Sequence, residues 1–318
     1  MTSASRVRDW GLLLICNLIW GSQFVFSKLV QREMGPLFAT LLPLGLTILV
    51  LLPVSVYQSR IRIIPAQEEK QGSRTVSLIV LGVFGQAAAL LLGTWGVRLT
   101  LASNAALLNL ALPVTTAIMA YLLLSERMTA IRAISFVLAI AGVIECSGIN
   151  WHELNFSSPQ ILLGNTLCFL AIVSSAFYNT YSKKILTGYS PVRLVFYTKL
   201  VAFLVLLPIT IYSESQSFKE LAHFSKVAWI GILFLALLRN LLALLLFLYV
   251  LKRLDATVAG MSNYLIPFFG VLTAATFLHE KLPVYMIMGG LLVLSSTLLA
   301  TMSDSRTRQP AAVSDPAR

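Results

Sequence analysis

The sequence predicts an all-α integral membrane protein with ten transmembrane helices, arranged as two inverted five-helix repeats. Composition is the first observation, because 57% of the 318 residues are apolar and only 12% are charged, whereas soluble domains carry about 25% charged residues. The second is a series of apolar stretches, each about as long as the 20 residues that a bilayer-spanning helix needs. The third is internal repetition, since the second half of the chain copies the pattern of the first.

Residues 101–128 are repeated at residues 255–282. Seven of the 28 aligned positions are identical, namely Ala102/Ala256, Ala105/Ala259, Asn109/Asn263, Pro113/Pro267, Ala120/Ala274, Leu124/Leu278 and Glu126/Glu280. Both copies are apolar, carry a proline near the middle and end in an acidic residue followed by a basic one. Residues 36–57 match residues 191–212 in the same way, with seven identities in 22 positions.

Ten membrane-spanning helices are therefore expected, at 10–31, 36–57, 76–97, 102–124, 132–149, 162–186, 191–212, 227–250, 256–278 and 283–302. The first repeat is expected to occupy residues 1–150 and the second residues 160–302. Because five is an odd number, the second repeat must enter the membrane from the opposite side, which makes the repeat inverted. The remaining residues, 303–318, are rich in Ser, Arg, Asp and Pro and are expected to form a disordered cytoplasmic tail.

The distribution of lysine and arginine predicts the orientation. If the N-terminus is cytoplasmic, the inner segments hold 16 basic residues and the outer loops hold five. Cytoplasmic loops of membrane proteins are enriched in these residues, so both termini are expected on the cytoplasmic side of the inner membrane. The net charge of +11 then reflects loops that face anionic lipid. The sequence has no basic patch with interleaved aromatic residues, so nucleic acid is not an expected partner.

The first expected helix contains Trp-Gly-Ser at residues 20–22 and ends near a lysine, and the fourth combines Pro113 with Ser-Glu-Arg at residues 125–127. Together with the two five-helix repeats, these motifs resemble the EamA-type transporters of the drug/metabolite transporter superfamily. The resemblance covers the chain apart from its two tails. It implies a ten-helix transporter with a substrate cavity between the halves, in a family that commonly exports amino acids or other small metabolites.

Two basic residues are expected at membrane depth, where charge is costly to bury and therefore points to function. Arg239 lies near the middle of the eighth expected helix with Asn240 beside it, and Lys199 lies inside the seventh. Neither has an acidic residue one helical turn away. We expect these cations to bind a substrate carboxylate or phosphate. The alternative is that each caps backbone carbonyls of a broken helix or extends to the interface.

Aromatic and amide side chains are the other candidates for substrate binding. Trp20 and Gln23 are three residues apart and so share one face of a helix. Asn109 and Asn263 each precede by four residues a proline that frees a backbone carbonyl, and Gln86 is the repeat equivalent of Asn240. The alternative for Trp20 and Gln23 is packing against a neighbouring helix. The alternative for Asn109 and Asn263 is an amide that satisfies the kink internally. The complete predicted substrate-binding set is Trp20, Gln23, Gln86, Asn109, Lys199, Arg239, Asn240, Asn263 and Tyr264.

Other polar residues are expected to have no chemical role. Glu126 and Glu280 lie at helix ends beside basic residues, so we expect them to anchor the fold rather than carry protons. Small multidrug-resistance relatives carry a membrane-embedded acid in their first helix, but Cys16 and Asn17 occupy that region here. The sequence contains no HExxH or GxGD motif and no CxxC pair, so no metal, cofactor or enzymatic activity is expected.

These observations predict a secondary transporter that works by alternating access. Its expected partners are the lipid bilayer and a small metabolite, amino acid-like and with an anionic group, that is moved outward by analogy with the family. A carrier for phosphorylated or nucleotide-linked sugars is an alternative, and a non-transporting membrane subunit is another. A monomer and a homodimer both fit the sequence, as do proton coupling, exchange and facilitated transport.

Overall fold

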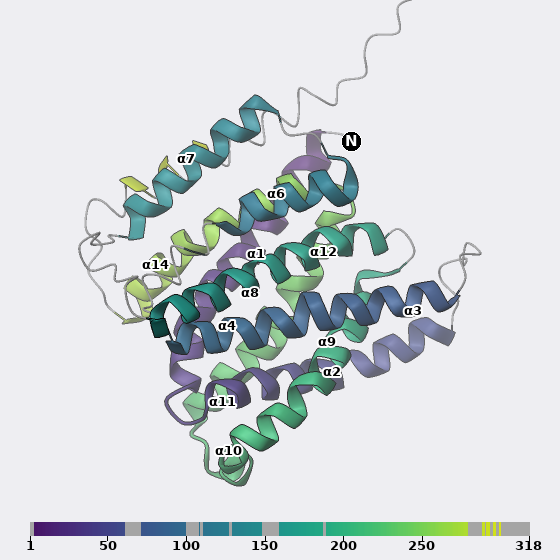
Figure 1. The fold of residues 1–318 in the computed structure, drawn as a ribbon, viewed down its shortest axis with the longest axis vertical. Helices are drawn as coiled ribbons and strands as arrows, with labels where there is room; N and C mark the ends of the chain where they lie inside the picture. Colours follow the sequence, from purple (N-terminus) through teal and green to yellow (C-terminus); the bar gives the residue numbers. More distant parts are fainter. Residues whose placement is uncertain are drawn as a thin grey trace, which may run out of the picture.

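The computed structural model describes residues 3–60, 71–99, 108, 111–126, 129–147, 159–186 and 189–278, together with residues 288, 289, 291, 292, 295, 296 and 299. Within these residues the secondary structure is helical and no strand occurs. The helices pack side by side as one bundle (Figure 1). The predicted all-α class is confirmed.

The helices have the following bounds: α1 Ser3–Val30, α2 Pro36–Arg60, α3 Gln71–Val80, η1 Leu81–Ala87, α4 Ala88–Leu99, α6 Ala111–Leu124, α7 Ala130–Ser147, α8 Pro159–Ile185, α9 Pro191–Ser213, α10 Ser215–Lys219, η3 Leu221–His223, α11 Lys226–Leu233, η4 Phe234–Ala243, α12 Leu244–Leu251, α13 Ala256–Met261, η5 Ser262–Tyr264 and α14 Leu265–Leu278. Six stretches are long and apolar enough to cross a membrane, at Val7–Ser27, Pro36–Tyr57, Thr75–Gly96, Pro159–Ile185, Pro191–Ser213 and Lys226–Leu251. They overlap the first, second, third, sixth, seventh and eighth expected helices.

The other expected helices differ from these six spans. The fourth and fifth overlap the shorter helices α6 and α7, and the ninth is divided into α13, η5 and α14. The tenth, at 283–302, falls mostly on residues outside the described part of the chain, and the tail at 303–318 falls there entirely. The count of ten helices and the inverted repeat therefore stay predictions.

Two of the spans change from α-helix to π-helix in their middle. In the span formed by α3, η1 and α4 the π-helical part is Leu81–Ala87, and in the span formed by α11, η4 and α12 it is Phe234–Ala243. Shifted by the repeat offset of 154 residues, 81–87 becomes 235–241, which lies inside the second π-helical stretch. π-Helical turns are rare and occur frequently at functional sites. They mark equivalent places in the two predicted halves.

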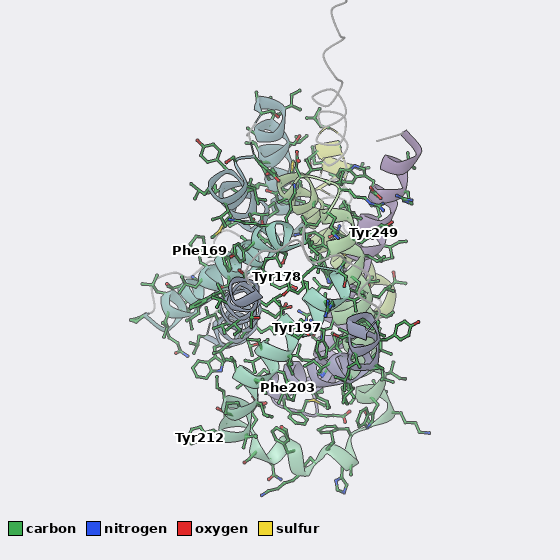
Figure 2. The ribbon with its side chains drawn as sticks, turned by 90° about the vertical axis from the view of Figure 1, so that its right-hand side faces the viewer. Phe169, Tyr178, Tyr197, Phe203, Tyr212 and Tyr249 are labelled. Carbon is green, nitrogen blue, oxygen red and sulfur yellow. The ribbon has the colours of Figure 1, made fainter. Side chains whose placement is uncertain are left out.

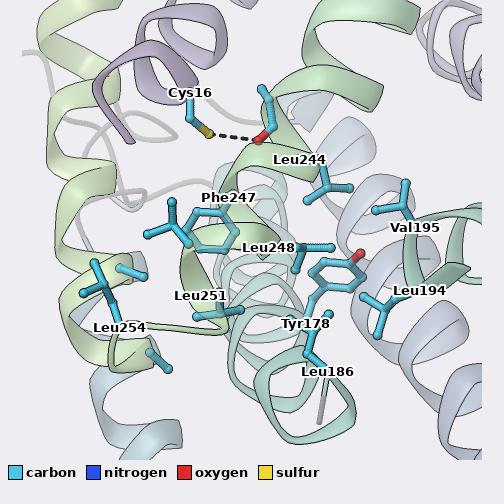
Figure 3. Close-up of a cluster of buried hydrophobic side chains, with 14 of the residues drawn as sticks. Cys16, Tyr178, Leu186, Leu194, Val195, Leu244, Phe247, Leu248, Leu251 and Leu254 are labelled. Carbon is cyan, nitrogen blue, oxygen red and sulfur yellow. Dashed lines mark hydrogen bonds between the residues drawn. The ribbon is translucent and has the colours of Figure 1, made fainter. Parts of the chain in front are cut away.

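Side chains of neighbouring helices satisfy backbone carbonyls of the second π-helical stretch. The Thr47 hydroxyl of α2 donates to the carbonyl of Ala236 at 2.9 Å. The Cys16 thiol of α1 donates to the carbonyl of Ala243 at 3.1 Å (Figure 3). Unpaired carbonyls are costly where no water reaches, so these bonds stabilise the irregular helix at its place between α1 and α2.

Helices from the two predicted halves pack against one another. From the first half, α1 contacts η4 and α14, α2 contacts α9, and both η1 and α4 contact α8. The largest buried apolar cluster contains side chains of both halves, with Leu13 and Cys16 from the first and Phe247 and Leu248 from the second (Figure 3). The hydrophobic core therefore holds the two halves together.

The outer surface of the bundle is also apolar. Phe84, Leu122 and Ile230 are 62%, 69% and 60% exposed. Figure 2 shows the exposed Tyr212 at the edge of the molecule and the buried Tyr178 in its interior. Large apolar side chains on the outside of apolar helices suit lipid acyl chains rather than water, as expected of a multi-pass membrane protein.

The glycine of the Trp-Gly-Ser run lies where α1 crosses α14. A Cβ atom at Gly21 would lie 2.7 Å from the Cβ of Phe269 and 2.8 Å from the backbone nitrogen of Gly270. Real Cβ atoms do not approach other atoms so closely. At Gly11, in the same helix, a Cβ would meet no atom within 4 Å. Gly21 therefore allows the two backbones to touch at this crossing.

Glu126 fixes the start of α13, at the end of the bundle where α1 begins. Its carboxylate oxygen Oε1 lies 2.7 Å from Lys183 Nζ. The carboxylate also accepts from the backbone N–H groups of Ala256 at 2.8 Å and Thr257 at 3.1 Å. The expectation that Glu126 anchors the fold is confirmed, with Lys183 as its basic partner. Glu280 lies outside the described residues.

Two further carboxylates tie the opposite end of the bundle together. Glu214 accepts from the backbone N–H groups of Leu37 at 3.0 Å and Phe38 at 2.8 Å, which caps α2. Glu33 accepts from the hydroxyl of Ser225 at 2.5 Å and from its backbone N–H at 2.8 Å. These bonds stabilise the ionised carboxylate and hold the pKa of Glu33 below its usual range. The connections between helices are thus fixed by acidic side chains.

Candidate substrate-binding site

The two predicted cations meet between α1, α9 and η4. Lys199, on α9, is only 1% exposed, and its Nζ donates to Asn240 Oδ1 at 3.2 Å. Arg239, on η4, donates from Nη1 to the same oxygen at 3.0 Å. Its Nε donates to Gln23 Oε1, on α1, at 2.5 Å. Four members of the predicted set, from three helices, thus form one hydrogen-bonded cluster. We call this cluster the cationic pair, after its two basic residues.

No carboxylate of a described residue pairs with either cation. Both partners, Asn240 and Gln23, are neutral amides. When both side chains are protonated, two positive charges share one neutral acceptor and repel each other, more strongly in a low-dielectric interior than in water. An anion placed between them would relieve this repulsion and accept the remaining donors. The arrangement can therefore bind an anionic group.

The described contacts of the two cations bear on the alternative roles, namely capping backbone carbonyls and extending to the interface. Within the described residues, Lys199 and Arg239 donate to side-chain amides and to no backbone carbonyl. Lys199 is almost completely buried, so its ammonium group does not extend to the interface. Among the described residues, neither side chain caps a backbone carbonyl.

Trp20 and Gln23 lie on the face of α1 that contacts the eighth expected helix. Gln23 reaches Arg239, whereas the ring of Trp20 packs against Phe247 with 5.3 Å between ring centroids. The shared face is confirmed. For Trp20 the contacts are those of a packed side chain, and its role in binding stays a prediction.

Asn263 and Tyr264 lie in η5, the short 3-10 turn that interrupts the ninth expected helix ahead of Pro267. Their side chains are 6% and 2% exposed. The Asn263 Oδ1 and Tyr264 hydroxyl oxygens have no hydrogen-bond partner among the described residues. The Tyr264 ring faces Phe136 of α7, with 6.2 Å between ring centroids. No described hydrogen bond joins this turn to the cationic pair.

The other two predicted residues, Gln86 and Asn109, have no described contact with the candidate site. Gln86 is partly buried in η1, a stretch that packs against the α9 helix of Lys199. No hydrogen bond of its side chain is found among the described residues. Asn109 lies outside the part of the chain that the structure describes. Neither residue is joined to the cationic pair by a described contact.

The prediction missed Asn17 and Ser262 as a pair. Asn17, fully buried on α1, donates from Nδ2 to the carbonyl of Leu13 at 2.8 Å and to Ser262 Oγ at 3.0 Å. Both amide hydrogens are thereby used, so its Oδ1 is left as an acceptor without a described partner. A lone asparagine in an apolar helix was the available signal, but its partner lies in the other half.

The described residues contain no group of three or more His, Cys, Asp or Glu side chains that could hold a metal ion. Cys16 and Cys168 are free and buried.

Comparison with known proteins agrees with this architecture. A solved structure titled "Crystal structure of protein" superposes with a TM-score of 0.77 over 95% of this chain and 99% of its own, at 15% identity, which supports the fold alone. An "uncharacterized transporter" from Archaeoglobus fulgidus is 25% identical over 290 residues, or 91% of this chain and 96% of the relative. A "probable terminal-alkyne amino-acid exporter" from Streptantibioticus cattleyicolor is 25% identical over 236 residues, or 74% of this chain and 76% of the relative.

The family comparison covers most of the chain. The model of the EamA-like transporter family matches residues 10–147 and 162–302. Members of this family are membrane transporters, which work in a lipid environment on small-molecule substrates. The chain is therefore a member of the EamA-like transporter family.

Proposed function

We propose that the protein is a secondary transporter that moves a small, amino acid-like metabolite with an anionic group across the inner membrane by alternating access. The observation that carries this proposal is the cationic pair, in which Lys199 and Arg239 share Asn240 without a carboxylate among their described partners. Charge at membrane depth is costly and marks substrate pathways in transporters. An anionic substrate would stabilise both cations.

The proposed architecture is ten helices in two inverted five-helix halves, with substrate bound between them. Three observations support it: the family matches two successive stretches of the chain, the π-helical stretches occupy equivalent positions, and helices pack across the halves. Substrate sites of such transporters lie near the midplane, where helices are discontinuous. The remaining predicted residues, Trp20, Gln86, Asn109, Asn263 and Tyr264, are proposed to contact the uncharged part of the substrate.

Outward transport is proposed from the relatives. The Streptantibioticus cattleyicolor relative is named as an exporter of a terminal-alkyne amino acid. An amino acid carries a carboxylate, which the guanidinium of Arg239 can bind through two parallel hydrogen bonds. Its name and the chemistry of the cationic pair both support a substrate that carries at least one carboxylate.

Both termini are proposed to be cytoplasmic, because the basic residues are concentrated in the segments that this orientation places inside. The test uses two exposed lysines, Lys219 in α10 and Lys252 after α12. In intact cells, a membrane-impermeant maleimide should label Lys219→Cys and not Lys252→Cys, with the wild-type chain as the background. Labelling of Lys252→Cys alone would reverse the proposed orientation, and labelling of both would contradict the topology.

Thermal stability and transport together test the function. The purified protein is screened against amino acids and organic acids, since a ligand that binds only the folded state raises the melting temperature. We expect anionic metabolites to raise it and the best of them to cross the membrane of liposomes that contain the protein. Transport of cationic or neutral metabolites with no response to anions would overturn the proposal.

A further inference from the structure

We propose that the substrate carries two negative charges, as a dicarboxylate or a phosphate monoester does, and that Lys199 and Arg239 bind them together. This inference rests on the proposed function and specifies the charge of its substrate. It also assigns Asn240 as a positioning residue that sets this preference for charge.

The charges of the cationic pair are the first argument. Lys199 and Arg239 lie within hydrogen-bond distance of one oxygen, and their described partners are neutral. A monoanion bound here would neutralise one of the two positive charges and leave the other buried without a counter-ion. A dianion neutralises both. The difference matters because Lys199 is almost inaccessible to solvent that could screen its charge.

The donors that remain lead to the same conclusion. A guanidinium group has five N–H donors and an ammonium group has three. Two donors of Arg239 and one donor of Lys199 are used by described residues. Three donors of Arg239 and two donors of Lys199 therefore remain. One carboxylate presents two oxygens, whereas two carboxylates present four and a phosphate monoester presents three terminal oxygens with two charges. The larger acceptor sets match the five remaining donors better.

Asn240 explains how the two cations are held side by side. Its Oδ1 accepts from both of them, and its side chain is only 6% exposed. Because the amide is neutral, it holds the cations in place without supplying a negative charge. A carboxylate of the same shape would supply one. The chemical identity of residue 240 therefore determines how many charges the substrate must bring.

The test compares dianions with matched monoanions. Succinate is compared with monomethyl succinate, and glycerol phosphate with its methyl diester, as competitors of transport into liposomes near neutral pH. Wild-type protein should prefer at least one dianion over its monoanion by roughly tenfold or more. The first pair reports a dicarboxylate substrate and the second reports a phosphate monoester.

Two variants should change the preference for charge. Asn240→Asp supplies an internal carboxylate, and Lys199→Met removes one cation, so both should bind the monoanion as well as or better than the dianion. Asn165→Asp is the matched control, because Asn165 is a buried asparagine on another helix, α8, and the hydrogen bonds of Lys199 and Arg239 go to Asn240 and Gln23. This control should keep the wild-type ratio. Lys199→Met carries the same comparison if Asn240→Asp does not fold.

The outcomes distinguish a failure of this inference from a failure of the proposed function. Equal binding of monoanions and dianions by the wild type, unchanged in Asn240→Asp and Lys199→Met, would overturn the inference and leave an anion transporter. Transport without any effect of either class of anion would overturn the proposed function itself. A wild-type preference for dianions that Asn165→Asp removes as readily as Asn240→Asp would overturn the role of Asn240.

Discussion

Replacing Arg239 by glutamine is expected to abolish transport while the yield of folded protein stays at the wild-type level. Glutamine can still hydrogen-bond to an amide such as Gln23 or Asn240, but it brings no charge to the substrate anion. Losing one partner of a buried, hydrogen-bonded charge pair costs about 2–5 kcal/mol, which corresponds to at least about a 30-fold loss of affinity. The measurement is uptake of the substrate into liposomes, with size-exclusion chromatography as the test of folding.

Arg32 provides the matched control. It is exposed in the connection between α1 and α2, so Arg32→Gln makes the same chemical change outside the cationic pair. This variant should transport like the wild type, because a substitution of an exposed residue outside the binding site changes the stability of the fold little. Wild-type transport by Arg239→Gln would remove Arg239 from the proposed site. An equal loss in both variants would instead point to the net charge of the protein.

That Lys199 and Arg239 lie inside long apolar helices could be predicted from the sequence, because such helices are visible as apolar stretches. The rotation of their side chains could not. Gln23 and Arg239 are 216 positions apart, and Lys199 and Asn240 are 41 apart, so only packing brings them together. Arg239 also lies in a π-helical stretch, where the 3.6-residue period that predicts a shared face no longer holds. Asn240 was found by a different signal, its equivalence to Gln86.

The irregular ninth expected helix likewise has one feature that the sequence could predict and one that it could not. A proline disrupts the preceding turn of a helix, so Pro267 predicted an interruption in this region, and η5 lies there. The contact that fixes the interruption could not be predicted, because Asn17 and Ser262 are 245 positions apart. The capping of α2 by Glu214 was missed for a similar reason. An acidic residue in a short connection looks solvated until the fold brings the N-terminus of another helix to it.

Glu126 was expected to anchor the fold, and replacing it is expected to cost more stability than any other exchange at a helix end. The substitution Glu126→Ala removes the ion pair to Lys183. It also removes the carboxylate that accepts from the first two N–H groups of α13, those of Ala256 and Thr257. It also removes the partner of the Thr257 hydroxyl, which donates to Glu126 at 2.9 Å. A lost cap costs about 1 kcal/mol, and each buried donor left without a partner adds about 1–3 kcal/mol.

The melting temperature of the purified protein should therefore fall by several degrees in Glu126→Ala. Glu220→Ala is the control, because Glu220 is exposed and accepts one hydrogen bond from Gln216 at 2.9 Å. Its loss should change the melting temperature little. A fall in Glu126→Ala no larger than that of the control would show that α13 begins without this cap.

A double-mutant cycle with Lys183→Met separates the ion pair from the cap. Lys183 has a second, more distant acidic neighbour in Asp255, at 3.6 Å, so losing Glu126 leaves it with a weaker partner. If the pair contributes, the double variant should lose less stability than the sum of the two single variants. If the losses add, the pair contributes nothing and the cap of α13 carries the whole effect. Glu126 joins the end of α6 to the start of α13 and, through Lys183, to the end of α8. Non-additive losses would show that the ion pair stabilises this junction. The ion pair would then have to break if those helices separate during transport.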